Sequence, residues 1–349
     1  MTSTASALRA PQMALRVRTV LVWVAGTAIL ALMALWLIIN FVHAPAQFFQ
    51  SAVYGLRNGV LYALIALGYT LVYGIIELIN FAHGDLFMLG TVFSAFTLTG
   101  LGLTVPNLTG WLGFALVLVL AMIFCASINV TIEFLAYRRL RRAPKLAPLI
   151  TAVGMSFVLQ FIGQQWNGST PRLWPSILPR GHFTIGGVTI DHNVFVVIAV
   201  TGGLLALMTW IVAKTRAGKA MRATAQDQDA ARLMGINVNR IISFTFAMGG
   251  ALAGAAGILY QQTVGTTRYN AGFQLGLIAF TAAVLGGIGN LTGAVLGGLL
   301  IGLIQGLNDG LPLYAPGQAW SQSVVFAILI MLMVFKPTGL LGQTVGEKV

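Results

Sequence analysis

The chain carries very little charge for its length. Of its 349 residues, 8% are charged and 57% are hydrophobic. Soluble domains carry about 25% charged residues, and a folded surface cannot be kept in water with a third of that. The composition therefore excludes a soluble enzyme, a disordered chain and a nucleic-acid-binding module. It predicts a polytopic membrane protein.

Cysteine and phosphate-binding motifs are also nearly absent. Cys125 is the only cysteine, which excludes a disulfide framework and a thiolate metal site. Gly218-Lys219 lacks the upstream glycine and the following hydroxyl of a phosphate-binding loop. No loop is long enough to form a soluble ligand-binding domain. We therefore expect no catalytic residue, metal or cofactor on this chain, and any ATP must bind to another chain.

The basic residues lie next to apolar runs. Sixteen of the 20 form clusters at Arg9–Arg18, Arg138–Lys145 and Lys214–Arg240, and at Lys336 and Lys348. Such clusters mark cytoplasmic loops, so both termini are predicted to be cytoplasmic. The other four, which would then lie outside, are Arg57, Arg172, Arg180 and Arg268. This distribution favours an orientation signal over a nucleic-acid surface.

Ten apolar runs are long enough, or nearly so, to cross a bilayer, which takes about 20 residues. They predict an all-α transmembrane bundle, although three short runs leave eight spans plus re-entrant pieces as an alternative. The runs are Val20–Val42, Leu56–Ile76, Phe81–Gly100, Trp111–Leu135, Leu146–Gln165, Val194–Ala213, Ile241–Gln261, Phe273–Ile288, Gly293–Leu307 and Gln322–Phe335.

These runs divide the chain into three parts. Residues 1–43 form a basic leader and a first helix that is too long for a signal-peptide core. Residues 44–341 form the transmembrane domain, and residues 342–349 a cytoplasmic tail. An external loop, residues 166–193, contains an alternating segment around Gly186-Gly187 that predicts a short hairpin. The cytoplasmic loop spans residues 214–240.

Small residues recur every fourth position in three stripes. The stripes are Gly249-Ala253-Gly257, Gly289-Gly293-Gly297 and Gly298-Gly302-Gly306. Small residues at this spacing let helix backbones approach closely in lipid. They predict a dense bundle and could also serve a subunit interface.

Polar residues interrupt the apolar sequence between the second and third runs. They are Glu77, Asn80, His83 and Asp85, with Gly84 among them. An acid at bilayer depth costs about 2.5–3.5 kcal/mol, so these groups need water, a partner or the interface. One interpretation is a tight turn with Asp85 at a helix N-terminus. The other is a broken helix that lines a solute path, with Gly84 permitting the bend.

The cytoplasmic loop carries start and stop signals for a helix of about ten residues, 225–234. Thr224 and Asp227 have the spacing of a capping box, and Gly235 can end the helix, with Ile236 folding back onto Ala230 or Ala231. Asp229 and Arg232 complement the helix dipole. A helix this short is marginal alone in water. It must rest on the bilayer or on a partner, and its acidic flanks favour the partner.

Three segments resemble one family of ABC importer permeases. Asp229-Ala-Ala-x-x-x-Gly235 resembles their Glu-Ala-Ala-x-x-x-Gly coupling motif, with Asp in place of Glu. The longer string Arg222–Asn237, Asn80–Asp85 and Val284–Gly298 resemble the branched-chain amino-acid permeases. The similarity runs from about Ala52 to Leu341 and is closest to the first of the two permease subunits.

The resemblance implies a function and a set of partners. The chain would be a multi-pass permease in the bacterial inner membrane that moves branched-chain or related amino acids. Its partners would be a periplasmic binding protein, two cytoplasmic ATPase subunits that bind ATP and Mg²⁺, and a second permease subunit, different or identical. The coupling residues would be Thr224, Asp227, Asp229, Ala230, Ala231, Leu233, Gly235, Ile236 and Asn237. The translocation path would include Glu77, Asn80, His83, Gly84 and Asp85.

Two alternatives stay open. Within the family, urea, short amides or aromatic compounds could replace branched-chain amino acids as substrates. From another class, Glu77, His83 and Asp85 could serve a proton-coupled secondary transporter. Uptake that persists without ATP and collapses with the proton gradient would indicate the latter.

Overall fold

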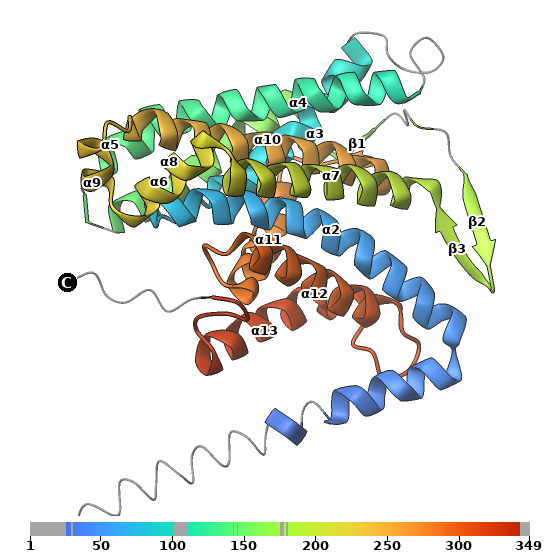
Figure 1. The fold of residues 1–349 in the computed structure, drawn as a ribbon. Helices are drawn as coiled ribbons and strands as arrows, with labels where there is room; N and C mark the ends of the chain where they lie inside the picture. Colours follow the sequence, from blue (N-terminus) through green and yellow to red (C-terminus); the bar gives the residue numbers. More distant parts are fainter. Residues whose placement is uncertain are drawn as a thin grey trace, which may run out of the picture.

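The computed structural model shows a helical bundle (Figure 1). It describes residues 26–28, 31–100, 110–141, 143–144, 146–174, 178 and 181–342. A first helix, Gly26–His43, precedes α2. The longer helices that follow are α2 (Pro45–Ile76), α3 (Ala82–Gly100), α4 (Trp111–Ile132), α6 (Leu146–Asn167), α7 (His192–Lys214), α10 (Val238–Val264), α11 (Ala271–Gly286), α12 (Leu291–Gly310) and α13 (Ser321–Phe335).

Shorter elements connect these helices. A π-helical turn, Glu133–Tyr137, and α5 (Arg138–Leu140) extend α4, and a 3-10 turn, Gln318–Trp320, leads into α13. The α7–α10 connection consists of α8 (Arg216–Gln226) and α9 (Gln228–Leu233). Among the described residues, two antiparallel strand pairs occur: β1 (Arg172–Leu173) with β4 (Thr266–Thr267), and β2 (His182–Ile185) with β3 (Val188–Asp191).

The predicted all-α bundle is confirmed, and a helix overlaps each of the ten apolar runs. Among the described residues, eight helices are long and apolar enough to span a membrane, and α3 and α11 account for the other two runs. The helix ends differ from the predicted ones. The α2 helix begins at Pro45 rather than Leu56, because proline suits the first helical turn and polar residues before Leu56 ended the apolar run. The basic leader and the tail from residue 343 lie outside the described residues.

The core of the bundle lies around α2, α3 and α10. These helices are buried along most of their length, whereas α4, α6, α7 and α13 expose large apolar side chains on their outer faces. An apolar outer surface of this extent suits lipid rather than water. The arrangement therefore fits a bundle that is surrounded by membrane.

The glycine stripes act inside the chain. Gly298, Gly302 and Gly306 on α12 lie against α2, where a Cβ added at Gly59 would come within 2.9 Å of Leu299 Cα. The prediction that these glycines serve a subunit interface is wrong, because α2 already covers them. Gly289 is not part of a helical stripe: it lies in the α11–α12 turn with a φ of 94°.

The predicted hairpin is present and docks on α2. Phe183 pairs with Ile190, and Gly186 and Gly187 have φ values of 57° and 82°. Two positive φ values indicate a primed turn, which matches the twist of paired strands. The Gln50 side chain donates to Thr189 O and accepts from Thr189 N, both at 2.7 Å. The hairpin therefore lies at one end of the bundle, opposite α9 (Figure 1).

Candidate functional site

The loop that carries α8 and α9 folds back against the end of α7. Thr215 Oγ1 accepts a hydrogen bond from Gly218 N at 3.1 Å and so caps α8. Gly218 lies directly against the backbone of Val212, and Arg222 donates to Val212 O. The base of the loop is therefore fixed to the bundle.

The α9 helix is capped by Asp227 and not by Thr224. Asp227 Oδ1 accepts from Asp229 N at 2.8 Å and from Ala230 N at 3.0 Å, while its own backbone is extended. Thr224 is buried inside α8, where its hydroxyl donates to Ala220 O at 2.8 Å. The predicted capping box and ten-residue helix are therefore wrong. An aspartate side chain that bonds the following N–H groups competes with a continuing helix, so two helices meet at Asp227.

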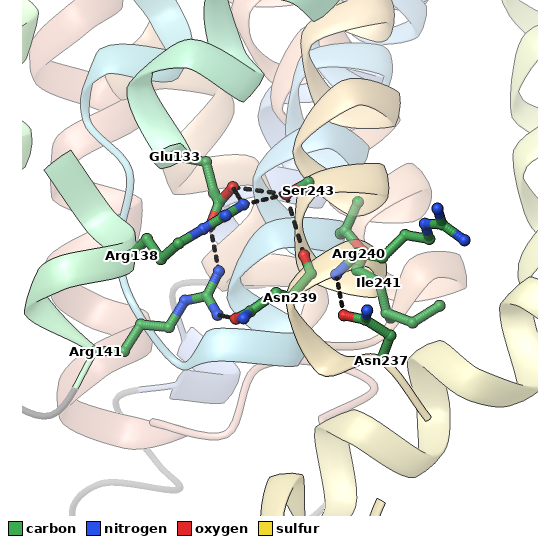
Figure 2. Close-up of polar contacts among 9 residues, drawn as sticks. Glu133, Arg138, Arg141, Asn237, Asn239, Arg240, Ile241 and Ser243 are labelled. Carbon is green, nitrogen blue, oxygen red and sulfur yellow. Dashed lines mark hydrogen bonds and ion pairs between the residues drawn. The ribbon is translucent and has the colours of Figure 1, made fainter. Parts of the chain in front are cut away.

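The end of α9 is as predicted. Gly235 has a φ of 81°, and Ile236 N donates to Ala231 O at 3.0 Å, which is the hydrogen bond of a Schellman end. Asn237 then caps α10 by accepting from Arg240 N at 3.1 Å (Figure 2). Within α9, Arg232 forms an ion pair with Asp229 at 2.7 Å.

The outer surface of α9 is apolar at its end. Leu233 is 88% exposed and Met234 82%, and Ala230 and Asp229 are exposed beside them. We call these four residues the α9 tip. Ala231, by contrast, is only 3% exposed. The sequence does not distinguish the two alanines, and the structure places only Ala230 on the surface.

The polar segment between α2 and α3 is a break between two helices. Glu77 ends α2 in a left-handed conformation with a φ of 53°, and α3 begins at Ala82. Gly84 lies within α3 and does not make the bend, which corrects the prediction. A Cβ at Gly84 would overlap Gly272 O and lie 2.8 Å from Gly276 Cα. This glycine instead permits close contact between α3 and α11.

Asn80, His83 and Asp85 are each buried, each against a different neighbour, whereas Glu77 is exposed. The His83 ring lies edge-on to Tyr69, with 4.7 Å between centroids. Asp85 accepts a hydrogen bond from Ser156 on α6, and Asn80 Oδ1 accepts one from Tyr137 at 2.9 Å. A small pocket beside Asn80 is lined by Tyr69, Tyr73, Leu78, Ile79, Asn80, Phe280, Ala283 and Ile288. Within the described ranges, no three His, Cys, Asp or Glu side chains gather as a metal site would require.

Sequence reasoning missed a buried ionic cluster at the end of α4. Glu133 is fully buried and pairs with Arg138 at 2.8 Å and with Arg141. Ser243 on α10 donates to the same carboxylate at 2.7 Å (Figure 2). The sequence signal is an acid near the end of an apolar run, followed by arginines five and eight residues later. The predicted role of these arginines in orientation did not include this contact.

A bundle whose helices are long enough to cross a bilayer and expose apolar side chains on their outer faces is a multi-pass membrane protein. This chain belongs to the family described as branched-chain amino acid transport system / permease component, whose profile matches residues 51–334.

Individual relatives agree with the family. The chain is 40% identical over 318 residues to the high-affinity branched-chain amino acid transport system permease protein BraD of Pseudomonas aeruginosa, covering 87% of this chain and 98% of BraD. It is 39% identical over 307 residues to the corresponding LivH of Escherichia coli K12, covering 86% and 98%. A shorter similarity, 31% over 135 residues, links 38% of the chain to 40% of the autoinducer 2 import permease LsrC of Photorhabdus laumondii. No solved structure matches.

Proposed function

We propose that this chain is the membrane-spanning permease subunit of an ATP-driven importer. It moves branched-chain or related amino acids that a periplasmic binding protein delivers. The observation that carries the proposal is the α9 tip, where Leu233 and Met234 are almost fully exposed at the end of a charged loop. Exposed apolar patches rimmed by polar residues mark protein contacts. The relatives named for branched-chain amino acids support the substrate.

The two ends of the bundle offer separate surfaces for the partners that we propose. Two cytoplasmic ATPase subunits supply ATP hydrolysis, and one of them binds the α9 tip. The binding protein docks at the opposite end, where β2 and β3 lie. A second permease subunit, different from this chain, completes the pathway, and a second copy of this chain is the alternative. The basic clusters support an inner-membrane orientation with α9 and both termini in the cytoplasm.

The geometry suggests how ATP binding moves the bundle. Hydrogen bonds fix both ends of α9: the Asp227 side chain accepts from Asp229 N, and Ile236 N donates to Ala231 O. A push on the tip therefore displaces α9 as a unit, together with the start of α10 that Asn237 caps. The buried residues Asn80, His83 and Asp85 form part of the solute path. This path needs little affinity, because the binding protein supplies the selectivity.

Reconstitution tests the proposal. The chain is placed in proteoliposomes with the permease and ATPase subunits encoded beside it, and leucine uptake is measured with the binding protein outside. We expect uptake only with ATP on the ATPase side. Uptake without ATP that collapses with the proton gradient would indicate a secondary transporter. Uptake of urea, short amides or aromatic compounds instead of leucine would change the substrate.

A further inference from the structure

We propose that the π-helical turn Glu133–Tyr137 is a positioning element that links the α9 loop to the buried Asn80–Asp85 segment. The inference rests on the proposed function, because it assigns the route by which movement of α9 reaches the solute path. It depends on two sets of contacts, one at each end of the same turn.

The first set holds the turn to the start of α10. The buried Glu133 carboxylate accepts from Ser243 Oγ at 2.7 Å, and Arg141, which pairs with the same carboxylate, donates to Asn239 Oδ1 at 2.7 Å (Figure 2). Asn239 and Ser243 lie in the first two turns of α10, directly after the Asn237 cap that follows α9. A shift of α9 therefore acts on Glu133 through only a few residues.

The second set holds the turn to the polar segment. Tyr137 is buried, and its hydroxyl donates to Asn80 Oδ1 at 2.9 Å. Its ring also packs against Phe246 of α10, with 5.6 Å between centroids. Asn80 lies three residues before His83, in the short connection from α2 to α3. One turn of five residues thus contacts both the start of α10 beside α9 and the proposed lining of the solute path.

The π geometry brings Arg138 to the same Glu133 carboxylate that anchors the first set. In an α-helix, residues five apart point about 140° away from one another. Here Arg138 N donates to Glu133 O, five residues back, so the wider turn places the Arg138 guanidinium beside the Glu133 carboxylate. Single π turns inside α-helices are rare and occur often at functional sites. A buried carboxylate that loses a partner is strongly destabilised, so we expect the cluster to move as a unit.

Tyr137→Phe tests the link with the smallest possible change. It removes one hydroxyl and leaves the ionic cluster intact. The matched control is Tyr62→Phe. It removes a hydrogen bond of 2.6 Å from the Tyr62 hydroxyl on α2 to Gln305 Oε1 on α12, which does not involve the π turn. Both variants are reconstituted with the partner subunits, and leucine uptake per ATP hydrolysed is measured.

We expect Tyr137→Phe to lower the uptake-to-ATP ratio by about fivefold, the factor that one hydrogen bond represents. ATPase activity stimulated by the loaded binding protein should stay near wild type, and Tyr62→Phe should keep the wild-type ratio. Asn80→Ala should reproduce the loss from the other side, and the double variant should be no worse than either single one.

Three outcomes would overturn the inference. An unchanged ratio in Tyr137→Phe would show that the turn transmits nothing. A parallel fall of uptake and ATPase activity would show that the Tyr137–Asn80 hydrogen bond only stabilises the fold. Additive losses in the double variant would show the same. A wild-type complex without ATP-dependent uptake would instead refute the proposed function, which keeps the two failures distinct.

Discussion

Single buried polar residues tie neighbouring helices to one another in this bundle. Asp85 on α3 bonds Ser156 on α6, and Asn129 on α4 donates to Phe246 O on α10 at 2.7 Å. An acid inside a membrane bundle is energetically costly unless it is paired, and such acids often mark functional sites. The Asp85 carboxyl is bonded by Ser156 and Gln160 of α6, and substitutions test whether it also serves transport.

The first residue-scale prediction concerns Asp85. Asp85→Asn keeps the shape of the side chain and removes its ability to carry charge. If the segment lines the path, uptake should fall while co-purification with the ATPase stays normal. Ser156→Ala is the control, because it removes the hydrogen bond and leaves the carboxyl in place. Normal uptake by Asp85→Asn would assign the segment to a turn without a role in the path.

The second residue-scale prediction concerns Gly84. A Cβ there would overlap the α11 backbone, so Gly84→Ala should force α3 and α11 apart and cost about 1–3 kcal/mol. Gly154→Ala on α6 is the matched control, since a Cβ there meets nothing within 4 Å. Thermal unfolding in detergent should show a lower midpoint for Gly84→Ala alone. Equal midpoints would mean that the helices adjust without cost.

Sequence reasoning succeeded for residues whose role is local and failed for those whose role depends on packing. The left-handed Gly235 and the fold-back of Ile236 were predictable, because a helix end is determined by its own few residues. Gly84 was misassigned and the burial of Ala231 was not predicted, since only the neighbouring elements decide that one contacts α11 and the other faces inward. The pairing of Glu133 with α10 was missed for the same reason.

At the element scale, α9 is a short helix whose two faces have different tasks. Leu233→Glu places a charge on the α9 tip and should weaken ATPase co-purification about tenfold or more without changing the thermal stability of the permease. Gly235→Val should act through the helix end, because a left-handed β-branched residue costs about 1–2 kcal/mol. Ala231→Glu should destabilise the chain itself. If Leu233→Glu co-purifies with as much ATPase as the wild type does, α9 does not contact the ATPase.

The hairpin gives a second element-scale prediction. Gln50→Ala removes both hydrogen bonds to Thr189, each worth about 1 kcal/mol, and should release β2 and β3 from α2. Hydrogen exchange of residues 182–191 should accelerate, while exchange in α10 stays unchanged. Gln47→Ala is the control, since Gln47 bonds Gly310 O and not the hairpin. Equal exchange in both variants would show that Gln50 does not hold the hairpin.

The number and type of elements were predictable, whereas their interruptions were not. Apolar length identified the helices, and alternation around two glycines identified the hairpin. The break between α8 and α9 depends on which of two side chains, Thr224 or Asp227, caps a helix. The π turn brings Glu133 beside a residue five positions away, a spacing that neither helical periodicity nor apolar length predicts. Composition does not reveal such local choices.

At the scale of the whole molecule, the hairpin and α9 lie at opposite ends of the bundle (Figure 1). Cysteine placed at Thr184 or at Gln226, both exposed, tests which end faces outward in a Cys125→Ser background. Impermeant maleimide added to whole cells should label Thr184→Cys only. Permeabilised cells should label both, which controls for reactivity. Labelling of Gln226→Cys alone in whole cells would reverse the orientation.

The contact between α2 and α12 limits how the bundle can change shape. The two backbones are in direct contact at Gly55, Gly59, Gly302 and Gly306, with no side chain between them. Sliding would drive Cα atoms into one another, and rolling would first require the helices to separate and open a void. We therefore expect α2 and α12 to move together as one rigid body. Any change of shape during transport therefore has its hinges elsewhere, where side chains interleave and can exchange rotamers.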